Sequence, residues 1–243
     1  SVVAIDSSGA NSNGAMGGYG RGFEWKGQEW LQRGANLAGE SEGDWCCYNS
    51  LSADGATIAV GAQRSAGSDN LVDSGQTRVL SWNGTDWIQK GSKIDGEAAN
   101  DRSGRYATKL SSDGLSLAIG ARLNDGNGND SGHVRVYKWA AGSWVQRGQD
   151  IDGESAGDLS GNSVSLSSDG GLVAIGAPGN DGAGDGAGHV RVYGWSDATL
   201  NWVQRGQDID GEVATCVEGA AYSDSDGDGV IDTCGDESGW ASH

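Results

Sequence analysis

The segment Trp144-Val145-Gln146-Arg147-Gly148 recurs along the chain and organises most of its length. Similar W-[LIV]-Q-[RK]-G segments begin at Trp30, Trp87 and Trp202, which gives spacings of 57, 57 and 58 residues. A Gly-Glu pair follows each of the four copies. Repeats of this size indicate stacked structural units, because a single unit can bury its apolar surface only against its neighbours.

Two further elements recur with the same period and predict short β-strands. Residues 115–119 and 133–139 alternate between apolar and polar side chains, which is the period of a strand. Asp-Gly, Asn-Gly and Gly-rich turns separate these segments. The element L-S-x-D-G, which leads into A-[VI]-G-A, begins at Leu51, Leu110 and Leu166. The element R-V-[LY]-x-W begins at Arg78, Arg135 and Arg191.

Each repeat therefore predicts four short strands, which end in L-S-x-D-G, A-[VI]-G-A, R-V-[LY]-x-W and W-V-Q-R-G. Four-stranded repeats of this size are typical of propeller blades. We therefore expect an all-β, four-bladed β-propeller with four-stranded antiparallel blades. Tryptophans at matching places in every repeat are expected to fill the space between blades. These are Trp25, Trp30, Trp82, Trp87, Trp139, Trp144, Trp195 and Trp202.

The two ends of the chain are expected to share one blade. The opening residues 2–5 resemble the second strand at residues 172–175, so the N-terminus supplies strands two to four and lacks strand one. Residues 214–223 are expected to supply the missing strand and to close the ring. The expected domains are blade 1 from residues 1–38 plus 214–223, blade 2 from 39–95, blade 3 from 96–152, blade 4 from 153–213, and a tail from 224–243. The alternative is an open array whose ends pair with another copy.

The last complete repeat resembles a known family. Residues 161–178, G-N-S-V-S-L-S-S-D-G-G-L-V-A-I-G-A-P, and residues 188–193, G-H-V-R-V-Y, resemble the FG-GAP repeat of integrin α-chain heads and of secreted microbial and algal proteins. The resemblance covers residues 1 to about 213 and implies a propeller that binds proteins or glycans. The loops around Asp54, Asp113 and Asp169 are shorter than the family's calcium loops, so we do not expect them to hold calcium as in integrins.

One motif predicts a calcium site. Residues 224–232 read D-x-D-x-D-G-x-x-D, and alternate carboxylates on a tight loop supply the oxygen ligands that Ca²⁺ prefers. With the adjacent Cys234 the loop resembles a thrombospondin type-3 or dockerin calcium loop. A solvated acidic turn is the alternative, and the Asn/Asp/Gly loops at 124–130 and 180–185 are weaker cation candidates. The expected ligands are Asp224, Asp226, Asp228, Asp232 and the carbonyl group of Val230.

Four cysteines indicate an oxidising compartment. In the closed ring, Cys216 and Cys234 would each bridge to one of the adjacent pair Cys46 and Cys47. The alternative joins Cys216 to Cys234 around the acidic loop and leaves a bond between the neighbours. Sequons place N-glycan acceptors at Asn83 and Asn129 if the source is eukaryotic. We therefore expect a mature, processed product that is secreted or displayed at the cell surface.

Charge and motif content exclude some functions. The 243 residues include 34 acidic and 16 basic side chains, and the net charge of −18 argues against nucleic-acid binding. No run of 18 apolar residues exists, so no membrane insertion is expected. His133 and His189 occupy the same repeat position, which favours a structural role. No partnered nucleophile or phosphate-binding loop is recognisable, so we expect the chain not to be an enzyme.

The favoured function is a secreted, calcium-stabilised propeller that binds an extracellular glycan or protein. Aromatic residues outside the repeat are the candidates for its ligand site, with local packing as the alternative; they are Trp45, Tyr48, Tyr222 and Trp240. A second hypothesis is self-assembly into an extracellular filament or coat, with the incomplete blade completed in trans. A polysaccharide-active enzyme is the third.

The acidic loop generates a first prediction. Removing calcium with a chelator should lower the melting temperature, because the carboxylates of residues 224–232 would then repel one another. Thermal unfolding followed by circular dichroism measures the shift. An unchanged melting temperature would argue against a structural calcium site.

Overall fold

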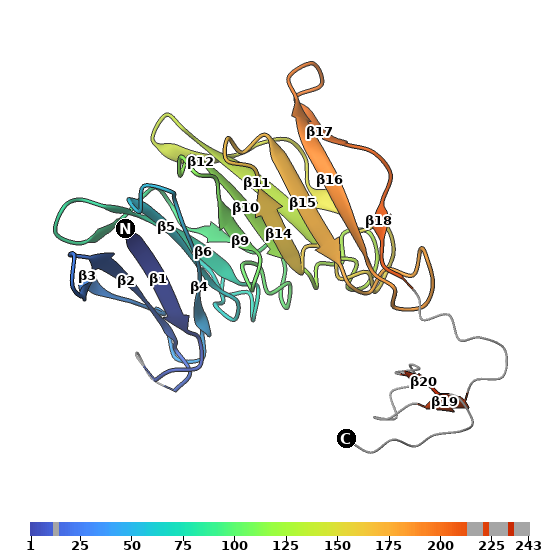
Figure 1. The fold of residues 1–243 in the computed structure, drawn as a ribbon, viewed down its shortest axis with the longest axis horizontal. Helices are drawn as coiled ribbons and strands as arrows, with labels where there is room; N and C mark the ends of the chain where they lie inside the picture. The colour runs from blue at the N-terminus through green and yellow to red at the C-terminus, as the bar shows by residue number, and fades with distance from the viewer. Residues whose placement is uncertain (12–14, 213–220, 224–232, 236–243) are drawn as a thin grey trace.

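The computed structural model describes residues 1–11 and 15–212, together with the backbone of strands β19 (Ala221–Ser223) and β20 (Thr233–Gly235). This part of the chain is all β. Four sheets of antiparallel strands follow one another in a row, and β19 pairs with β20 in a small separate sheet (Figure 1). The described residues form no helix, and so none that is long and apolar enough to cross a membrane.

The first sheet has three strands, β1 (Val2–Ser7), β2 (Tyr19–Trp25) and β3 (Trp30–Ala38), in that order. As expected, β1 matches the second strand of the later repeats, and the strand that would come first is missing from this sheet. Val2 pairs with Glu24 and Ser7 pairs with Tyr19, so β1 is paired along its whole length on one side. Within the described residues no strand pairs with its other side.

Each of the other three sheets follows the expected order of four strands and adds a fifth strand of two residues. This short strand pairs with the third strand, beyond the end of the fourth. The second sheet contains β4 (Cys46–Leu51), β5 (Thr57–Ala62), β6 (Gln76–Trp82), β7 (Trp87–Gln89) and β8 (Ile94–Asp95). The third contains β9 (Thr108–Leu110), β10 (Ser116–Ala121), β11 (His133–Ala140), β12 (Ser143–Gln146) and β13 (Ile151–Asp152). The fourth contains β14 (Ser163–Leu166), β15 (Leu172–Ala177), β16 (His189–Ser196), β17 (Asn201–Gln204) and β18 (Ile209–Asp210).

The cores lie between successive sheets. The second strand of each sheet supplies their centre: Ile58, Leu117 and Val173 are each 0% exposed. Three clusters of buried side chains fill the spaces from the first sheet to the fourth. Both faces of the second strand are apolar in the sequence, as in A-I-G-A, because sheets pack against both sides.

The paired tryptophans connect neighbouring sheets, which confirms their expected place for all but the first pair. In each repeat the two rings pack against each other, with centroids 5.3–5.5 Å apart. The second ring reaches back: Trp144 Nε1 donates a hydrogen bond of 2.9 Å to the carbonyl oxygen of Lys90 in the preceding repeat. Trp87 and Trp202 make the equivalent bonds. Trp25 and Trp30 belong to the first sheet, which has no preceding sheet to bond to among the described residues, and they are 40% and 45% exposed.

The closure of the ring through residues 214–223 is not seen among the described residues. β19 pairs with β20 and not with β1, and the first and fourth sheets lie at opposite ends of the row (Figure 1). The acidic loop at 224–232 lies outside the described residues. The expected closure rested on counting strands, and strand count does not fix the angle between successive sheets.

The structure joins Cys46 to Cys47, which is half of the second pairing that the sequence left open. Both cysteines are 0% exposed in the core between the first two sheets, packed with Leu37 and Ile58. Because these two cysteines are bonded to each other, neither forms the favoured bridge to Cys216 or Cys234 in this structure. Cys216 and the side chain of Cys234 lie outside the described residues.

Close approach of the sheets generates a second prediction. A Cβ atom at Gly120 in β10 would overlap the carbonyl oxygen of Gly161 in the next repeat. Replacing Gly120 with Ala should therefore lower the free energy of unfolding by about 3 kcal/mol, measured by urea denaturation.

Gly176 provides the matched control. It occupies the same repeat position in β15, but within the described residues no further sheet packs on it, and the only close contact of a Cβ atom there would be the Ser163 hydroxyl group, which can rotate away. Gly176→Ala should cost less than about 1 kcal/mol. Equal losses in the two variants would contradict the stacking argument.

Candidate functional site

Polar side chains gather where successive sheets meet, at the end of the sheets where the third strand begins. We call these places the first, second and third junctions, in chain order from the first sheet to the fourth. Each junction contains the Glu of the Gly-Glu pair from one repeat. Two residues come from the next repeat. One is the first residue of its third strand, and the other is the residue immediately before its short fifth strand.

The Gly of each pair sets the position of the Glu that follows it. In the second junction, Gly96 N donates a hydrogen bond of 2.8 Å to the carbonyl oxygen of Gly75. A Cβ atom at Gly96 would overlap the carbonyl oxygen of Ser74, so only glycine fits this backbone contact. Glu97 is thereby held facing the third sheet.

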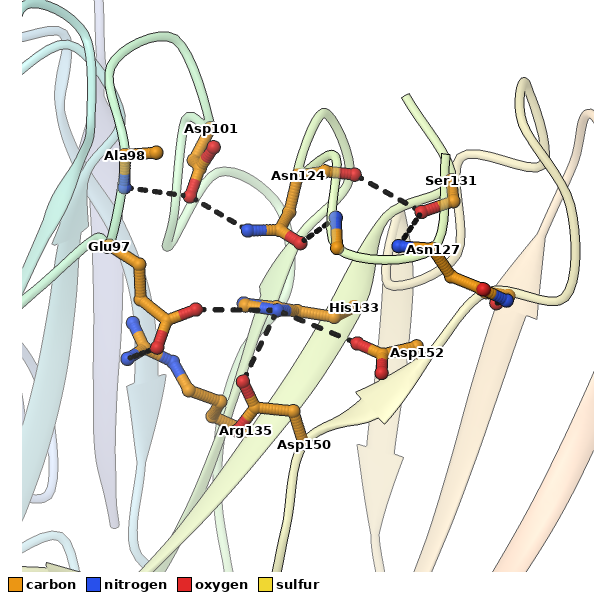
Figure 2. Close-up of polar contacts among 12 residues, drawn as sticks. Glu97, Ala98, Asp101, Asn124, Asn127, Ser131, His133, Arg135, Asp150 and Asp152 are labelled. Carbon is orange, nitrogen blue, oxygen red and sulfur yellow. Dashed lines mark hydrogen bonds and ion pairs between the residues drawn. The ribbon is translucent and has the colours of Figure 1, made fainter. Parts of the chain in front are cut away.

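Figure 2 shows the second junction, in which three carboxylates surround one nitrogen of a buried histidine. His133, the first residue of β11, is 2% exposed at its side chain. Its Nδ1 atom lies 3.8 Å from Glu97 Oε2, 3.6 Å from Asp150 Oδ2 and 4.0 Å from Asp152 Oδ1. These separations are longer than ordinary N–H···O hydrogen bonds. The groups therefore face one another without a direct hydrogen bond.

Arg135 occupies the other oxygen of the same glutamate. Its Nη1 atom lies 3.2 Å from Glu97 Oε1, and its Nη2 atom donates a hydrogen bond of 2.9 Å to the carbonyl oxygen of Asp95. The guanidinium group thus ties β11 to the preceding repeat. It leaves Glu97 Oε2 facing the histidine.

Burial controls the protonation of this cluster. Burial, with help from the charge of Arg135, lowers the pKa of His133 to about 4, against the opposing effect of Asp150. The imidazole is therefore neutral at neutral pH. Burial also raises the pKa of Glu97 and of Asp152. The second junction accordingly holds more carboxylates (Glu97, Asp150 and Asp152) than basic groups (Arg135), beside a neutral imidazole.

A second polar layer closes the junction above the cluster. Asp101 accepts hydrogen bonds of 3.1 Å from Ala98 N and 3.0 Å from Asn124 Nδ2, which belongs to the next repeat (Figure 2). Asn124 Oδ1 in turn accepts a hydrogen bond of 2.8 Å from Gly126 N. The loop at 124–130 thus uses its leading polar side chain for its own turn and for the junction, as does Asn180 in the loop at 180–185.

The third junction repeats the cluster. His189 Nδ1 lies 3.9 Å from Glu154 Oε2 and 3.5 Å from Asp208 Oδ2, and Arg191 Nη1 lies 3.5 Å from Glu154 Oε1. The side chain of His189 is 1% exposed, and neither of its nitrogens has a hydrogen-bond partner. The described residues therefore hold two groups of Glu, His and Asp whose ligand atoms lie within 4.8 Å of one another.

The first junction has a different set of side chains at the same repeat positions. Gln76 stands where the others have histidine, and Lys93 stands where they have aspartate. Lys93 Nζ contacts Glu40 Oε2, and Gln76 Nε2 donates a hydrogen bond of 2.8 Å to Asp95 Oδ1. Glu40, Gln76 and Lys93 line a pocket of about 300 Å³, which we call the junction pocket. Its lining also includes Glu42, Asp44, Arg64, Ser65, Ser68 and Asn70.

The aromatic ligand candidates are not brought together as one site. The ring of Trp45 lies 5.4 Å from the guanidinium carbon of Arg64, which lines the junction pocket, but Trp45 itself does not line it. Tyr48 instead packs edge-on against Tyr106 of the next repeat, with centroids 4.8 Å apart. The side chain of Tyr222 and all of Trp240 lie outside the described residues, as do the expected calcium ligands at 224–232. The sequon residues Asn83 and Asn129 are both exposed.

Sequence reasoning assigned His133 and His189 a structural role and missed the carboxylates around them. The signal was available in the repeat itself. Each histidine is followed by an aspartate in the same repeat and preceded by the Glu of the previous repeat. Where histidine gives way to Gln76, aspartate gives way to Lys93. Paired replacement at two positions indicates that their side chains meet.

Solved structures with a similar fold are β-propellers. They include one protein from Bacteroides uniformis and one from Bacteroides fragilis, each provisionally named a 6-phosphogluconolactonase. The first has a TM-score of 0.55 and 13% identity, and covers 81% of this chain and 50% of its own. The second has a TM-score of 0.57 and 12% identity, and the match covers 87% of this chain and 52% of that protein. The chain thus spans about half the length of these structures. No family model matches the chain, and no curated protein matches it.

One expectation drawn from the sequence, that the chain is not an enzyme, is corrected by these structures. Both carry the names of enzymes, so the lack of a recognisable catalytic motif does not exclude catalysis on this fold. The reason is geometric: side chains from separate sheets converge at one face without leaving a compact motif in the sequence, as the junctions show. At such low identity the likeness is one of fold, and the activity belongs to those proteins.

Proposed function

We propose that the chain is an extracellular binding module for a neutral glycan, built on an FG-GAP-like β-propeller. In this proposal the loop at 224–232 binds Ca²⁺, and the module acts outside the cell or at its surface. The four sheets are its four blades. The observation that carries the proposal is the junction pocket between the first two sheets.

The junction pocket suits a ligand that is rich in hydroxyl groups. Its volume of about 300 Å³ is within the range of small-molecule sites. Arg64 and Lys93 are hydrogen-bond donors, Glu40 is an acceptor, and Ser68 can act as either. The net charge of −18 favours a neutral ligand over a polyanion.

Arg64 provides the third prediction. Replacing Arg64 with Ala should weaken glycan binding by about tenfold or more, because an exposed donor of the pocket is lost. Binding is measured on a glycan array and then by calorimetry with the best ligand. Arg105→Ala is the matched control: this arginine also lies over an aromatic ring, Tyr106, but does not line the junction pocket. Equal losses in both variants, or a wild-type protein that binds no glycan, would refute the proposal.

A second candidate function, assembly with other copies, is supported by faces at both ends of the row that no other described residue covers. In the first sheet, Val3 and Ile5 are 40% and 48% exposed, whereas the equivalent Ile58 and Val60 are 0% and 1% exposed. In the fourth sheet, Ile209 is 61% exposed, whereas its equivalents inside the row are nearly fully buried. Each end face thus matches one side of the contact that recurs within the chain, which favours head-to-tail packing or blade completion in trans.

Ile209 provides the fourth prediction. Ile209→Lys should reduce the assembled fraction measured by light scattering, because a charge would enter the contact between copies. Ile88→Lys is the control, since Ile88 on β7 is 48% exposed and does not belong to either end face. A wild-type protein that is strictly monomeric would exclude assembly.

A further inference from the structure

In the first junction, the negative charge of the glutamate is balanced partly by a lysine of the next repeat. There, the ammonium group of Lys93 lies between the preceding repeat's Glu40 and the fifth strand of its own sheet. A cation is therefore part of the protein at this junction. The second and third junctions keep the glutamate and its arginine partner, but they replace the lysine with Asp150 and Asp208. Each loses one positive charge and gains one negative charge at the same place.

The replacement is accompanied by a histidine. Gln76 gives way to His133 and His189 in the two junctions that lack the lysine. An amide and an ammonium group have thus become an imidazole and a carboxylate, which are two of the three common zinc ligand types. Glu97 and Glu154, each with one oxygen facing the histidine, supply a third ligand.

The geometry fits an ion shared between these groups. Ligands about 2.0–2.1 Å from a tetrahedral Zn²⁺ ion lie roughly 3.4 Å from one another. His133 Nδ1 lies 3.6 Å from Asp150 and 3.8 Å from Glu97, with Asp152 farther away at 4.0 Å, and His189 Nδ1 lies 3.5 Å from Asp208 and 3.9 Å from Glu154. These separations are too long for strong hydrogen bonds and close to those of ligands around one ion.

The buried His189 points independently to a ligand. His189 is 1% exposed at its side chain, its Nδ1 atom is aimed between Glu154 and Asp208, and it has no hydrogen-bond partner. Buried polar atoms are rarely left unpaired, because desolvation without a partner costs free energy. An ion at Nδ1 would supply a partner for that nitrogen, and its two positive charges would offset those of the two carboxylates.

We infer that the second and third junctions are metal sites: Glu97, His133 and Asp150 bind one divalent first-row transition ion, and Glu154, His189 and Asp208 bind another. The imidazole ligand favours Zn²⁺ over Ca²⁺ or Mg²⁺, which take oxygen ligands. Because each glutamate comes from the repeat before its histidine, each ion joins two successive sheets. Zn²⁺ performs at these junctions the bridging that Lys93 performs at the first.

The repeat supplies its own matched variants for the test. The double variants His133→Gln with Asp150→Lys, and His189→Gln with Asp208→Lys, install the residues of the first junction in the second and the third. Chelator-treated protein is dialysed against Zn²⁺, and bound metal is quantified per chain. Each double variant should bind one Zn²⁺ ion fewer than the wild type, and the four-residue combination two fewer. Zinc should also raise the melting temperature of the wild type by several degrees, with a smaller rise in each variant.

The reverse change tests the inference by a gain. Gln76→His with Lys93→Asp should add one zinc ion per chain, because it builds the same ligand set around Glu40. Ca²⁺ in place of Zn²⁺ should not reproduce any of these differences, which separates the junctions from the acidic loop at 224–232. The inference fails if the wild type binds no zinc, if the combined variant binds as much as the wild type, or if a folded reverse variant gains none. Circular dichroism shows whether each variant is folded.

Discussion

The packing of each sheet on the next is the interaction on which the rest of this structure depends. A single sheet exposes apolar side chains on both faces, and only a neighbour on each side buries them. Ile58 and Leu117, inside the row, are completely buried, whereas Val3, at the same repeat position in the first sheet, is 40% exposed. The close approach demands glycine in the second strands, and the tryptophans fill the wider space at the other edge.

The same packing creates the polar chemistry of the molecule. With a constant repeat length, the glutamate that ends one repeat always meets the arginine of the next, so a single charged contact is made three times. Around this fixed pair, the neighbouring positions are free to differ. Glu40 meets a lysine and lines a pocket, whereas Glu97 meets a neutral histidine and an aspartate. One architectural contact thus supports different ligand chemistry at successive junctions.

Most of the fold could be predicted from the sequence, because strand period, turn residues and repeat spacing are local signals. The two-residue strands such as Ile151–Asp152 were missed, since so short a segment has no period. The clusters were harder: Glu97 and His133 lie in different repeats, and their meeting depends on how sheets stack. Pairing of Cys46 with Cys47, and the relation of the two ends of the row, likewise depend on three-dimensional placement that spacing does not determine.

Hydrogen bonds from one tryptophan and one arginine of each later repeat to carbonyl oxygens of the preceding repeat have a mechanical consequence. Trp144 binds Lys90 O and Arg135 binds Asp95 O, so side-chain bonds hold adjacent sheets together at both of these places, in addition to the polar contacts of the junction. Under tension applied along the row, these joints bear the load in series. The force at which the row separates is therefore that of its weakest joint, whatever the strength of the hydrogen bonding within the sheets.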